Sequence, residues 1–498
     1  MSRIKLLKIF SDGFFDLLRR AESLLILTLI FPAFVLADDR PNIIVLLCDD
    51  LGFGDIGCYG HPHIRTPNLD AMAQAGLLCQ SFYSAAPVCS PSRVGLLTGR
   101  SPNRAGVYDW IPAAEKIKPD ARDQVHMRQK ETTMARLLKQ SGYDTAMAGK
   151  WHCNSRFDSN DQPQPNDHGF DHWFATQNNA SPSHKDPKNF VRNGQPVGPL
   201  DGFSCQIVMD EALNWLNKRQ EKKSDQNTNP FFLYIAFHEP HEPVASPEKL
   251  VNSYLGITQS REQAEYFANV TNVDLAVGRL LDRLKKTRLD ENTLVIFTSD
   301  NGPETLNRYR SANRSFGTPG LLKGMKLWTN EAGFRVAGIF YWPGKIKSGR
   351  TSVPLSALDL LPTFCSFADS ELPKNLKLDG MDISSFLMGE ELEQSRPLIW
   401  AYYNSINKQR VAMRFKNWKV LATIDGGRFP KVQNIHNGII ERLRSAVLTD
   451  FEIYDVTADI GETKNLVTSL PEGPKLIGLI QQEYQNLLQD SYVWQRHR

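Results

Sequence analysis

The sequence lacks several features that would place a protein in a functional class at once. Its 498 residues carry a formal charge of only +3, so no overall basicity argues for nucleic acid or a membrane surface as a partner. It has no internal repeat, no low-complexity tract and no Walker-type phosphate loop. Function must therefore be inferred from local groups of residues.

The apolar run near the N-terminus, Leu24–Ala37, is too short to span a bilayer. It has about 14 residues, whereas a membrane helix needs roughly 20. Basic residues precede it and small residues end it, a pattern typical of a secretory signal peptide. Residues 1–37 are therefore predicted to be a signal peptide. No stable membrane insertion is expected, and export leads to the periplasm, the extracellular space or a lysosome, depending on the host.

Cysteine is scarce, and its count is odd. Seven cysteines in an exported chain indicate that at least one has a role other than disulfide pairing. We single out Cys89 for the reasons given below. Cys48 lies in an apolar run and is predicted to be a buried thiol, and the sequence does not determine any disulfide pairing.

Three apolar runs end in polar residues. Continuous apolar runs are typical of strands buried on both faces of a parallel sheet, and ligands gather at the carboxyl ends of such strands. The runs and the polar residues that follow them are Asn42–Cys48 with Asp49 and Asp50, Pro230–Phe237 with His238 and His241, and Thr293–Ser299 with Asp300, Asn301 and Gly302.

Adjacent carboxylates at a strand end repel each other unless a cation neutralises them. Oxygen ligands alone favour calcium or magnesium. Asp49 and Asp50 therefore suggest a cation site, although a solvated acidic turn explains this pair equally well by itself. Gly302 is expected to let the chain turn sharply after Asp300 and Asn301.

A further polar pair follows the predicted strand Tyr143–Ala148. Lys150 and His152 alternate along an extended segment, so both side chains can face one side. Such a pair more often lies on the surface, but its place at a strand end favours a site. The polar segment 153–205 is predicted to form long loops above the sheet, where substrates are commonly recognised.

The order of elements predicts an α/β protein with a large, mostly parallel central sheet flanked by helices. Strands alternate with predicted helices up to about residue 390. From residue 396 the pattern changes to short strands at hairpin spacing and one helix, Leu476–Gln489, which predicts a small antiparallel sheet. We therefore expect a catalytic domain over residues 38–390 and a small α+β domain over residues 391–498.

The most informative segment is Cys89-Ser90-Pro91-Ser92-Arg93, which continues to Leu97-Thr98-Gly99-Arg100. It places a cysteine in a short loop fixed by Pro91, and the apolar and small residues that follow suit the start of a helix, whose unpaired first-turn N–H groups attract anions. Arg93 adds a planar, permanently charged group suited to sulfate or phosphate. The alternative is that Cys89 is merely a buried thiol beside a helix cap.

The whole string resembles the signature of the type I sulfatases of the alkaline-phosphatase-like superfamily. In that family a maturation enzyme oxidises this cysteine to the aldehyde formylglycine. The resemblance covers about residues 41–390, and residues 451–466 are similar to the family's carboxyl-terminal region. It implies an alkaline-phosphatase-like fold and an exported, arylsulfatase-like sulfuric ester hydrolase that acts on a sulfated small molecule or carbohydrate.

The resemblance also implies a role for each matching residue. The divalent cation, usually calcium in the family with magnesium as the alternative, would be held by Asp49, Asp50, Cys89, Asp300 and Asn301. The sulfate would be surrounded by Arg93, Lys150, His152, His241 and Lys326. His241, with Lys326, would protonate the leaving alcohol, and His152 would take a proton from the hydrated aldehyde. His238 is the fallback for His241.

Two other functions remain open at this point. Phosphate or phosphonate ester hydrolysis belongs to the same superfamily, because phosphate and sulfate are nearly isosteric. A carbohydrate-binding relative without catalysis is a second alternative, which the intact set of polar residues disfavours. Export and long polar loops favour a sulfated polysaccharide as substrate, but position and exo or endo action stay undetermined.

Overall fold

The computed structural model describes residues 39–114, 122, 124–157, 161–222, 229–393 and 396–495. The predicted signal peptide lies outside these residues. Within the described ranges, no helix combines the length and the apolar character that crossing a bilayer requires.

A ten-stranded sheet forms the centre of the fold, and its middle is parallel. The strand order is β12-β2-β11-β9-β1-β8-β4-β5-β6-β7. The parallel strands are β9 (Thr293–Ser299), β1 (Asn42–Asp49), β8 (Phe231–Pro240), β4 (Asp144–Lys150) and β5 (His172–Thr176). The other strands of the sheet are β12 (Gly349–Thr351), β2 (Leu77–Cys79), β11 (Gly338–Tyr341), β6 (Val191–Arg192) and β7 (Gln195–Pro196). The predicted mostly parallel sheet is confirmed.

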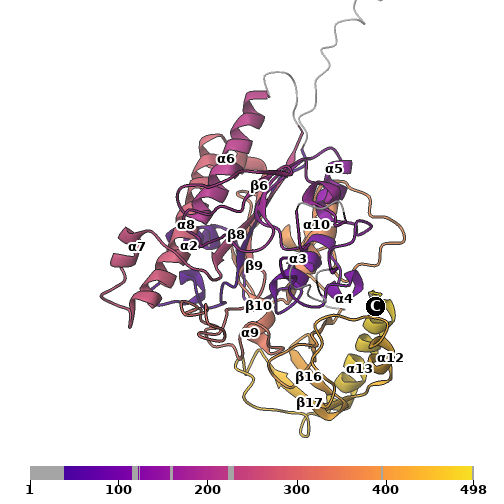
Figure 1. The fold of residues 1–498 in the computed structure, drawn as a ribbon. Helices are drawn as coiled ribbons and strands as arrows, with labels where there is room; N and C mark the ends of the chain where they lie inside the picture. Colours follow the sequence, from indigo (N-terminus) through magenta and orange to yellow (C-terminus); the bar gives the residue numbers. More distant parts are fainter. Residues whose placement is uncertain are drawn as a thin grey trace, which may run out of the picture. The chain divides into compact units, whose positions relative to one another are not determined.

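The apolar strand runs are buried because helices cover both faces of this sheet (Figure 1). Along β1, Ile43, Val45 and Leu47 enter one core layer, and the alternate residues enter the other. The first layer includes α3 (Cys89–Thr98), α5 (Met134–Gln140) and α10 (Leu360–Phe367). The second includes α2 (Pro67–Ala75), α6 (Ser204–Lys222) and α8 (Arg261–Lys286).

A separate four-stranded antiparallel sheet follows near the carboxyl end, as predicted. Its strands are β14 (Leu398–Ala401), β15 (Val411–Phe415), β16 (Trp418–Ile424) and β17 (Leu448–Asp455), and α13 (Gly473–Asp490) contacts all four. A three-stranded sheet completes the fold, with β10 (Arg335–Val336), β3 (Phe82–Tyr83) and β13 (Leu355–Ser356). The domain boundary at residue 390 stays a prediction.

A buried group of charged residues joins the four-stranded sheet to the rest of the chain. We call it the Glu331 cluster: Tyr83, Glu331, Arg335 and Lys419. The Glu331 carboxylate accepts hydrogen bonds from Lys419 at 3.1 Å, from Tyr83 at 2.7 Å and from Arg335 at 3.3 Å. Both of its oxygens are therefore paired.

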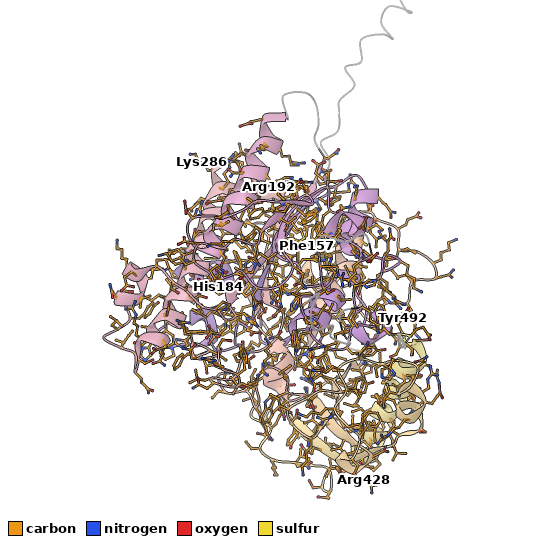
Figure 2. All side chains as sticks on the ribbon, viewed as in Figure 1. Phe157, His184, Arg192, Lys286, Arg428 and Tyr492 are labelled. Atoms are coloured by element: carbon orange, nitrogen blue, oxygen red, sulfur yellow. The ribbon has the colours of Figure 1, made fainter. Side chains whose placement is uncertain are left out.

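Side chains fill the space between the sheets and the helices (Figure 2). His184 lies in the interior, whereas Lys286 and Arg428 lie at the exposed periphery. All seven cysteines are free, and Cys48 is fully buried, as predicted.

Candidate active site

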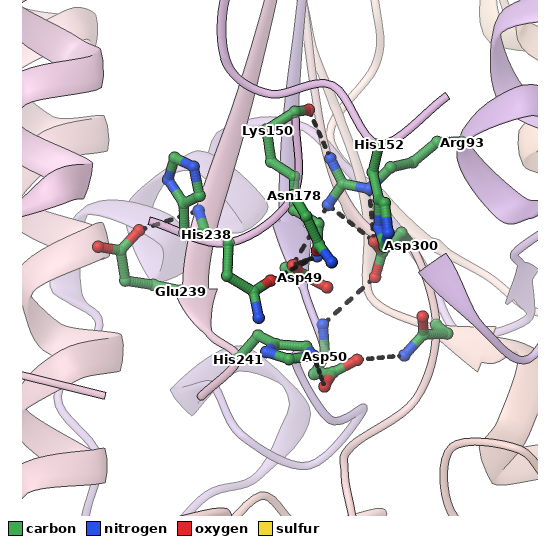
Figure 3. Close-up of polar contacts among 12 residues, drawn as sticks. Asp49, Asp50, Arg93, Lys150, His152, Asn178, His238, Glu239, His241 and Asp300 are labelled. Carbon is green, nitrogen blue, oxygen red and sulfur yellow. Dashed lines mark hydrogen bonds and ion pairs between the residues drawn. The ribbon is translucent and has the colours of Figure 1, made fainter. Parts of the chain in front are cut away.

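The carboxyl ends of four parallel strands bring the predicted polar residues together. Asp49 ends β1, Lys150 ends β4, and Asp300 directly follows β9. The Lys150 ammonium lies 2.5 Å from a carboxylate oxygen of Asp49, and both side chains are fully buried (Figure 3). Asp50 adopts a left-handed backbone conformation with φ of 65°, which re-aims its side chain after the strand. We call Asp49, Asp50, Lys150, Asp300 and the adjacent Asn301 the strand-tip cluster.

Arg93 ties several strand ends together from the first turns of α3. Its Nε donates to Asp300 at 2.8 Å, and its Nη1 donates to the carbonyl oxygen of Lys150 at 2.8 Å. Its Nη2 also lies 3.8 Å from Asp49. Cys89 is the first residue of α3, every residue of which is buried, so the thiol has a fixed position at the helix start.

Lys326 and His241 both approach the carboxylate of Asp50. The Lys326 ammonium lies 2.7 Å from Asp50 Oδ2, and His241 Nε2 lies 3.5 Å from the same oxygen. The amide nitrogen of Asn301 donates to Asp50 Oδ1 at 2.7 Å. Lys326 lies 276 positions from Asp50 in the chain, so distant segments meet at this carboxylate.

His238 lies within β8 and His241 directly follows it, and these two candidate histidines differ in what they face. His241 lines the cavity described below. His238 is fully buried, and its Nε2 lies 2.7 Å from the hydroxyl of Thr176. The geometry therefore favours His241 over His238 for contact with a substrate.

His152 is buried, and a backbone group fixes its ring. Its Nε2 lies 2.8 Å from the carbonyl oxygen of Ile111, which can only accept, so Nε2 carries the proton. The other nitrogen, Nδ1, is buried without a hydrogen-bond partner among the described residues. That nitrogen is therefore available to accept a proton.

The strand-tip cluster fits a hard cation. Asp49 Oδ1 and Asn301 Oδ1 are buried acceptors with no hydrogen-bond partner in the described parts of the chain. One ligand atom each from Asp49, Asp50 and His241 lies within 4.8 Å of the other two. Unpaired buried oxygens are costly unless something positive meets them, and carboxylate and amide oxygens suit calcium or magnesium. The sequence had assigned His241 to the substrate, whereas its position places it beside the cation ligands as well.

The carboxyl groups of the strand-tip cluster differ in pKa. Burial alone would raise the pKa of Asp49, but the positive charges of Lys150 and Arg93 outweigh it and hold that pKa well below its usual range. Burial and the charge of Asp49 together raise the pKa of Asp300 to about 7. Neighbouring carboxylates therefore resist ionising together, which a divalent cation would relieve.

The Cys89 side chain is a poor nucleophile as a thiol. Burial raises its pKa to about 12, and the nearby ammonium groups of Lys150 and Lys326 only partly offset this effect. The thiolate is the reactive form of cysteine, and it is scarce at neutral pH with such a pKa. Ordinary cysteine catalysis is therefore disfavoured at this position.

A cavity of about 360 Å³ opens above Cys89. Four predicted residues line it: Cys89, His152, His241 and Lys326. The sequence did not identify the remaining lining residues, which are Val88, Trp110, Asn178, Asn179, Glu304, Arg308, Tyr309 and Leu327. Asn178 and Asn179 lie in the segment that was predicted to form substrate loops, and Glu304 lies just past the β9 strand end. No signal pointed to Trp110.

The expected reason for Gly302 was wrong. Its φ is not in the left-handed region, so the position does not require glycine for a turn. A side chain there would meet the carbonyl oxygen of Ala332 at 1.7 Å. Glycine is needed because the chain passes against α9 (Glu331–Phe334).

Comparison with known proteins agrees with this geometry. The profile of the family described as Sulfatase matches residues 41–370, which include the whole strand-tip cluster and the Cys89 string. The chain belongs to the sulfatase family. This sulfatase is 36% identical to N-acetylgalactosamine-6-sulfatase of Canis lupus familiaris over 380 residues, covering 73% of this chain and 69% of the relative. It is 34% identical to arylsulfatase A of Homo sapiens over 369 residues, covering 70% of this chain and 68% of that relative.

A solved structure resembles the sulfatase over most of its length. The crystal structure of Ps i-CgsB matches with a TM-score of 0.74 and 28% identity, covering 91% of this chain and 94% of that chain. Ps i-CgsB has also been solved in complex with k-i-k-neocarrahexaose. The predicted class of sulfuric ester hydrolases and the predicted fold are confirmed.

Proposed function

We propose that this sulfatase cleaves sulfate esters of a sulfated carbohydrate with formylglycine made from Cys89. In this proposal Asp49, Asp50, Asp300, Asn301 and the modified residue 89 hold calcium, with magnesium as the alternative. The observation that carries it is the convergence of unpaired ligand oxygens and buried cationic side chains beside Cys89. Export through the signal peptide and oxidation by a maturation enzyme belong to the same proposal.

The cationic residues would bind and orient the sulfate. Lys326 lines the cavity, and Lys150 and Arg93 are buried beside Asp49. The carboxylates around them hold these cationic groups in position. Little reorganisation is therefore needed when negative charge develops on the sulfate oxygens. When bound, the cation and formylglycine would supply Lewis acidity and a hydroxyl nucleophile, which the buried thiol does not provide.

Two histidines would handle protons at identifiable atoms. His152 Nδ1 is unprotonated, has no hydrogen-bond partner among the described residues, and would act as the base. His241 Nδ1 lies 2.6 Å from the carbonyl oxygen of Glu242, so Nε2 is the atom left to serve the leaving alcohol. Burial and the charge of Lys326 lower the His241 pKa to about 3. The negative charge of a bound sulfate would counteract this effect, and Lys326 would assist as a second donor.

A carbohydrate substrate is supported by the relatives. N-acetylgalactosamine-6-sulfatase carries an amino sugar in its name, and Ps i-CgsB, at 28% identity, was solved with an oligosaccharide. The cavity combines aromatic residues with polar amides, as carbohydrate sites commonly do. The position of the cleaved sulfate and exo or endo action are not part of the proposal.

The test uses protein from a host that oxidises such cysteines. Turnover of an aryl sulfate, an aryl phosphate and defined sulfated oligosaccharides is measured side by side, with peptide mass spectrometry over residues 80–100. We expect release of sulfate from the saccharides and an aldehyde at position 89. Faster turnover of the phosphate would favour the phosphatase alternative, and full activity with an unmodified Cys89 would refute the nucleophile.

A further inference from the structure

The cavity contains a cationic side chain that the sulfate site does not use. Arg308 lies on its wall, on the segment that follows the β9 strand end. Its Nε and Nη2 donate to the two oxygens of Glu304, each at 2.7 Å. The Glu304 side chain is only 4% exposed, whereas that of Arg308 is 34% exposed. The pair therefore has a buried acidic half and an accessible basic half.

The pairing leaves the outer edge of the guanidinium open. Arginine has five N–H donors, and Glu304 uses one on Nε and one on Nη2. The remaining three lie on Nη1 and Nη2, and in the described residues no other side-chain hydrogen bond engages them. This edge matches the bidentate geometry of a carboxylate or a sulfate.

Two neighbours hold the guanidinium in place. Glu304 grips one edge, and the ring of Tyr309, which also lines the cavity, lies with its centroid 5.0 Å from the guanidinium carbon. Arg308 and Glu304 are four residues apart in the chain, so the contact is local and short. A group that is already oriented loses little entropy when it binds an anion.

Glu304 also connects this edge to the sulfate site. Its carboxylate lies 3.8 Å from the ammonium of Lys326, which contacts Asp50. Arg308 and Lys326 therefore lie in one cavity, with the Glu304 carboxylate between them. A substrate that reaches Cys89 passes within reach of both.

We propose that Arg308, oriented by Glu304 and Tyr309, binds a second anionic group of the substrate beside the sulfate ester that is cleaved. This inference rests on the proposed function, and it narrows the substrate class to saccharides with two neighbouring negative charges. The second group is a sulfate or a carboxylate, because both present the same paired oxygens to a guanidinium. Simple neutralisation of Glu304 is the competing explanation, and it requires no open edge toward the cavity.

The experiment measures binding without turnover, using the full chain with Cys89→Ala. Dissociation constants are measured by calorimetry for N-acetylgalactosamine 6-sulfate, its 4,6-disulfate, and a uronate-containing disaccharide 6-sulfate. They are compared among the parent chain, Arg308→Ala and the double variant Glu304→Gln/Arg308→Gln, which leaves no unpaired carboxylate near Lys326. Arg310→Ala, an exposed arginine on the same segment, is the matched control.

We expect a doubly charged ligand to bind more tightly than the monosulfate, with the preference reduced about tenfold to a hundredfold by Arg308→Ala and by the double variant. Arg310→Ala should leave the preference for the doubly charged ligand unchanged. A preference for the disulfate identifies sulfate as the second group, and one for the uronate identifies a carboxylate. No preference in the parent chain, or an equal loss for all three ligands, would show that Arg308 only neutralises Glu304. Failure of the proposed function appears separately, as absent turnover by the formylglycine protein.

Discussion

Two buried clusters of opposite charges differ in one respect, which is whether their oxygens are satisfied. In the Glu331 cluster, Lys419, Tyr83 and Arg335 together pair both oxygens of the carboxylate. In the strand-tip cluster, Asp49 Oδ1 and Asn301 Oδ1 are buried without partners among the described residues. Both clusters are buried, so burial does not separate a binding site from a structural one.

The comparison shows what marks the active site. A cluster that only stabilises the fold is complete without a ligand, because an unpaired buried acceptor costs free energy of unfolding. A cluster that binds a cation and an anion is incomplete until they arrive. The following predictions test this distinction, beginning with the largest expected effect.

Replacing Cys89, the source of the proposed nucleophile, should have the largest effect. Cys89→Ser offers one hydroxyl and cannot form an aldehyde hydrate, so sulfate taken from a substrate has no second hydroxyl to expel it. We expect repeated turnover of an aryl sulfate to fall by at least about a thousandfold. Mass spectrometry should detect a sulfate ester on the substituted side chain. Cys365→Ser, a buried cysteine in α10, is the control and should retain activity.

Neutralising one proposed cation ligand should have the next largest effect. Asp300→Asn is expected to lower kcat/KM by at least about a hundredfold, because it removes a charge from the strand-tip cluster. Added calcium should raise the unfolding temperature of the parent chain, since a ligand that binds only the folded state stabilises it. This shift should vanish in Asp300→Asn and persist in Asp274→Asn, a buried carboxylate that accepts hydrogen bonds at the start of α2. A calcium shift that survives Asp300→Asn would remove Asp300 from the site.

Disrupting the Glu331 cluster should affect the stability of the fold rather than ligand binding. Lys419→Met leaves Glu331 without one fully buried partner, and we expect the free energy of unfolding to fall by about 3–5 kcal/mol. Urea denaturation measures this loss. The calcium-induced shift in unfolding temperature should remain, and its disappearance would contradict the separation of the two clusters.

The smallest expected effect concerns pH. Burial and the charge of Glu331 raise the pKa of Glu462, which accepts a hydrogen bond from the backbone N–H of Glu331, to about 7. The folded state therefore holds a proton that the unfolded state releases near pH 4.3. This contribution to stability is complete below that pH and is lost as the pH rises to about 7, at up to about 1.4 kcal/mol per pH unit. Glu462→Gln should flatten that slope in denaturation curves, and an unchanged slope would refute the assignment.

The sequence predicted the central strands well because their residues are buried on both faces. β9 begins and ends at the predicted residues, and β1 extends only one residue further. The start of β17 at Leu448 was harder to predict, because Asp450 and Glu452 break the apolar pattern of this strand. The order of the ten strands was not predicted, since it depends on contacts between distant segments.

The candidate site was predictable only where its residues follow strand ends or form a known string. Asp49, Lys150 and Asp300 have such positions. Trp110 and Arg308 do not, because their place on the cavity wall is set by how loops pack. The choice between His238 and His241 needed coordinates, since a three-residue difference decides which ring reaches the cavity.

The complete burial of α3 has a consequence for the order of events in the life of the chain. An enzyme that oxidises Cys89 has to grasp the residues on both sides of it, and the finished fold offers none of them. Under the proposed function, the aldehyde is therefore installed while this stretch is still extended. Folding then buries the aldehyde. A molecule that folds before oxidation keeps an unmodified, unreactive Cys89 thiol.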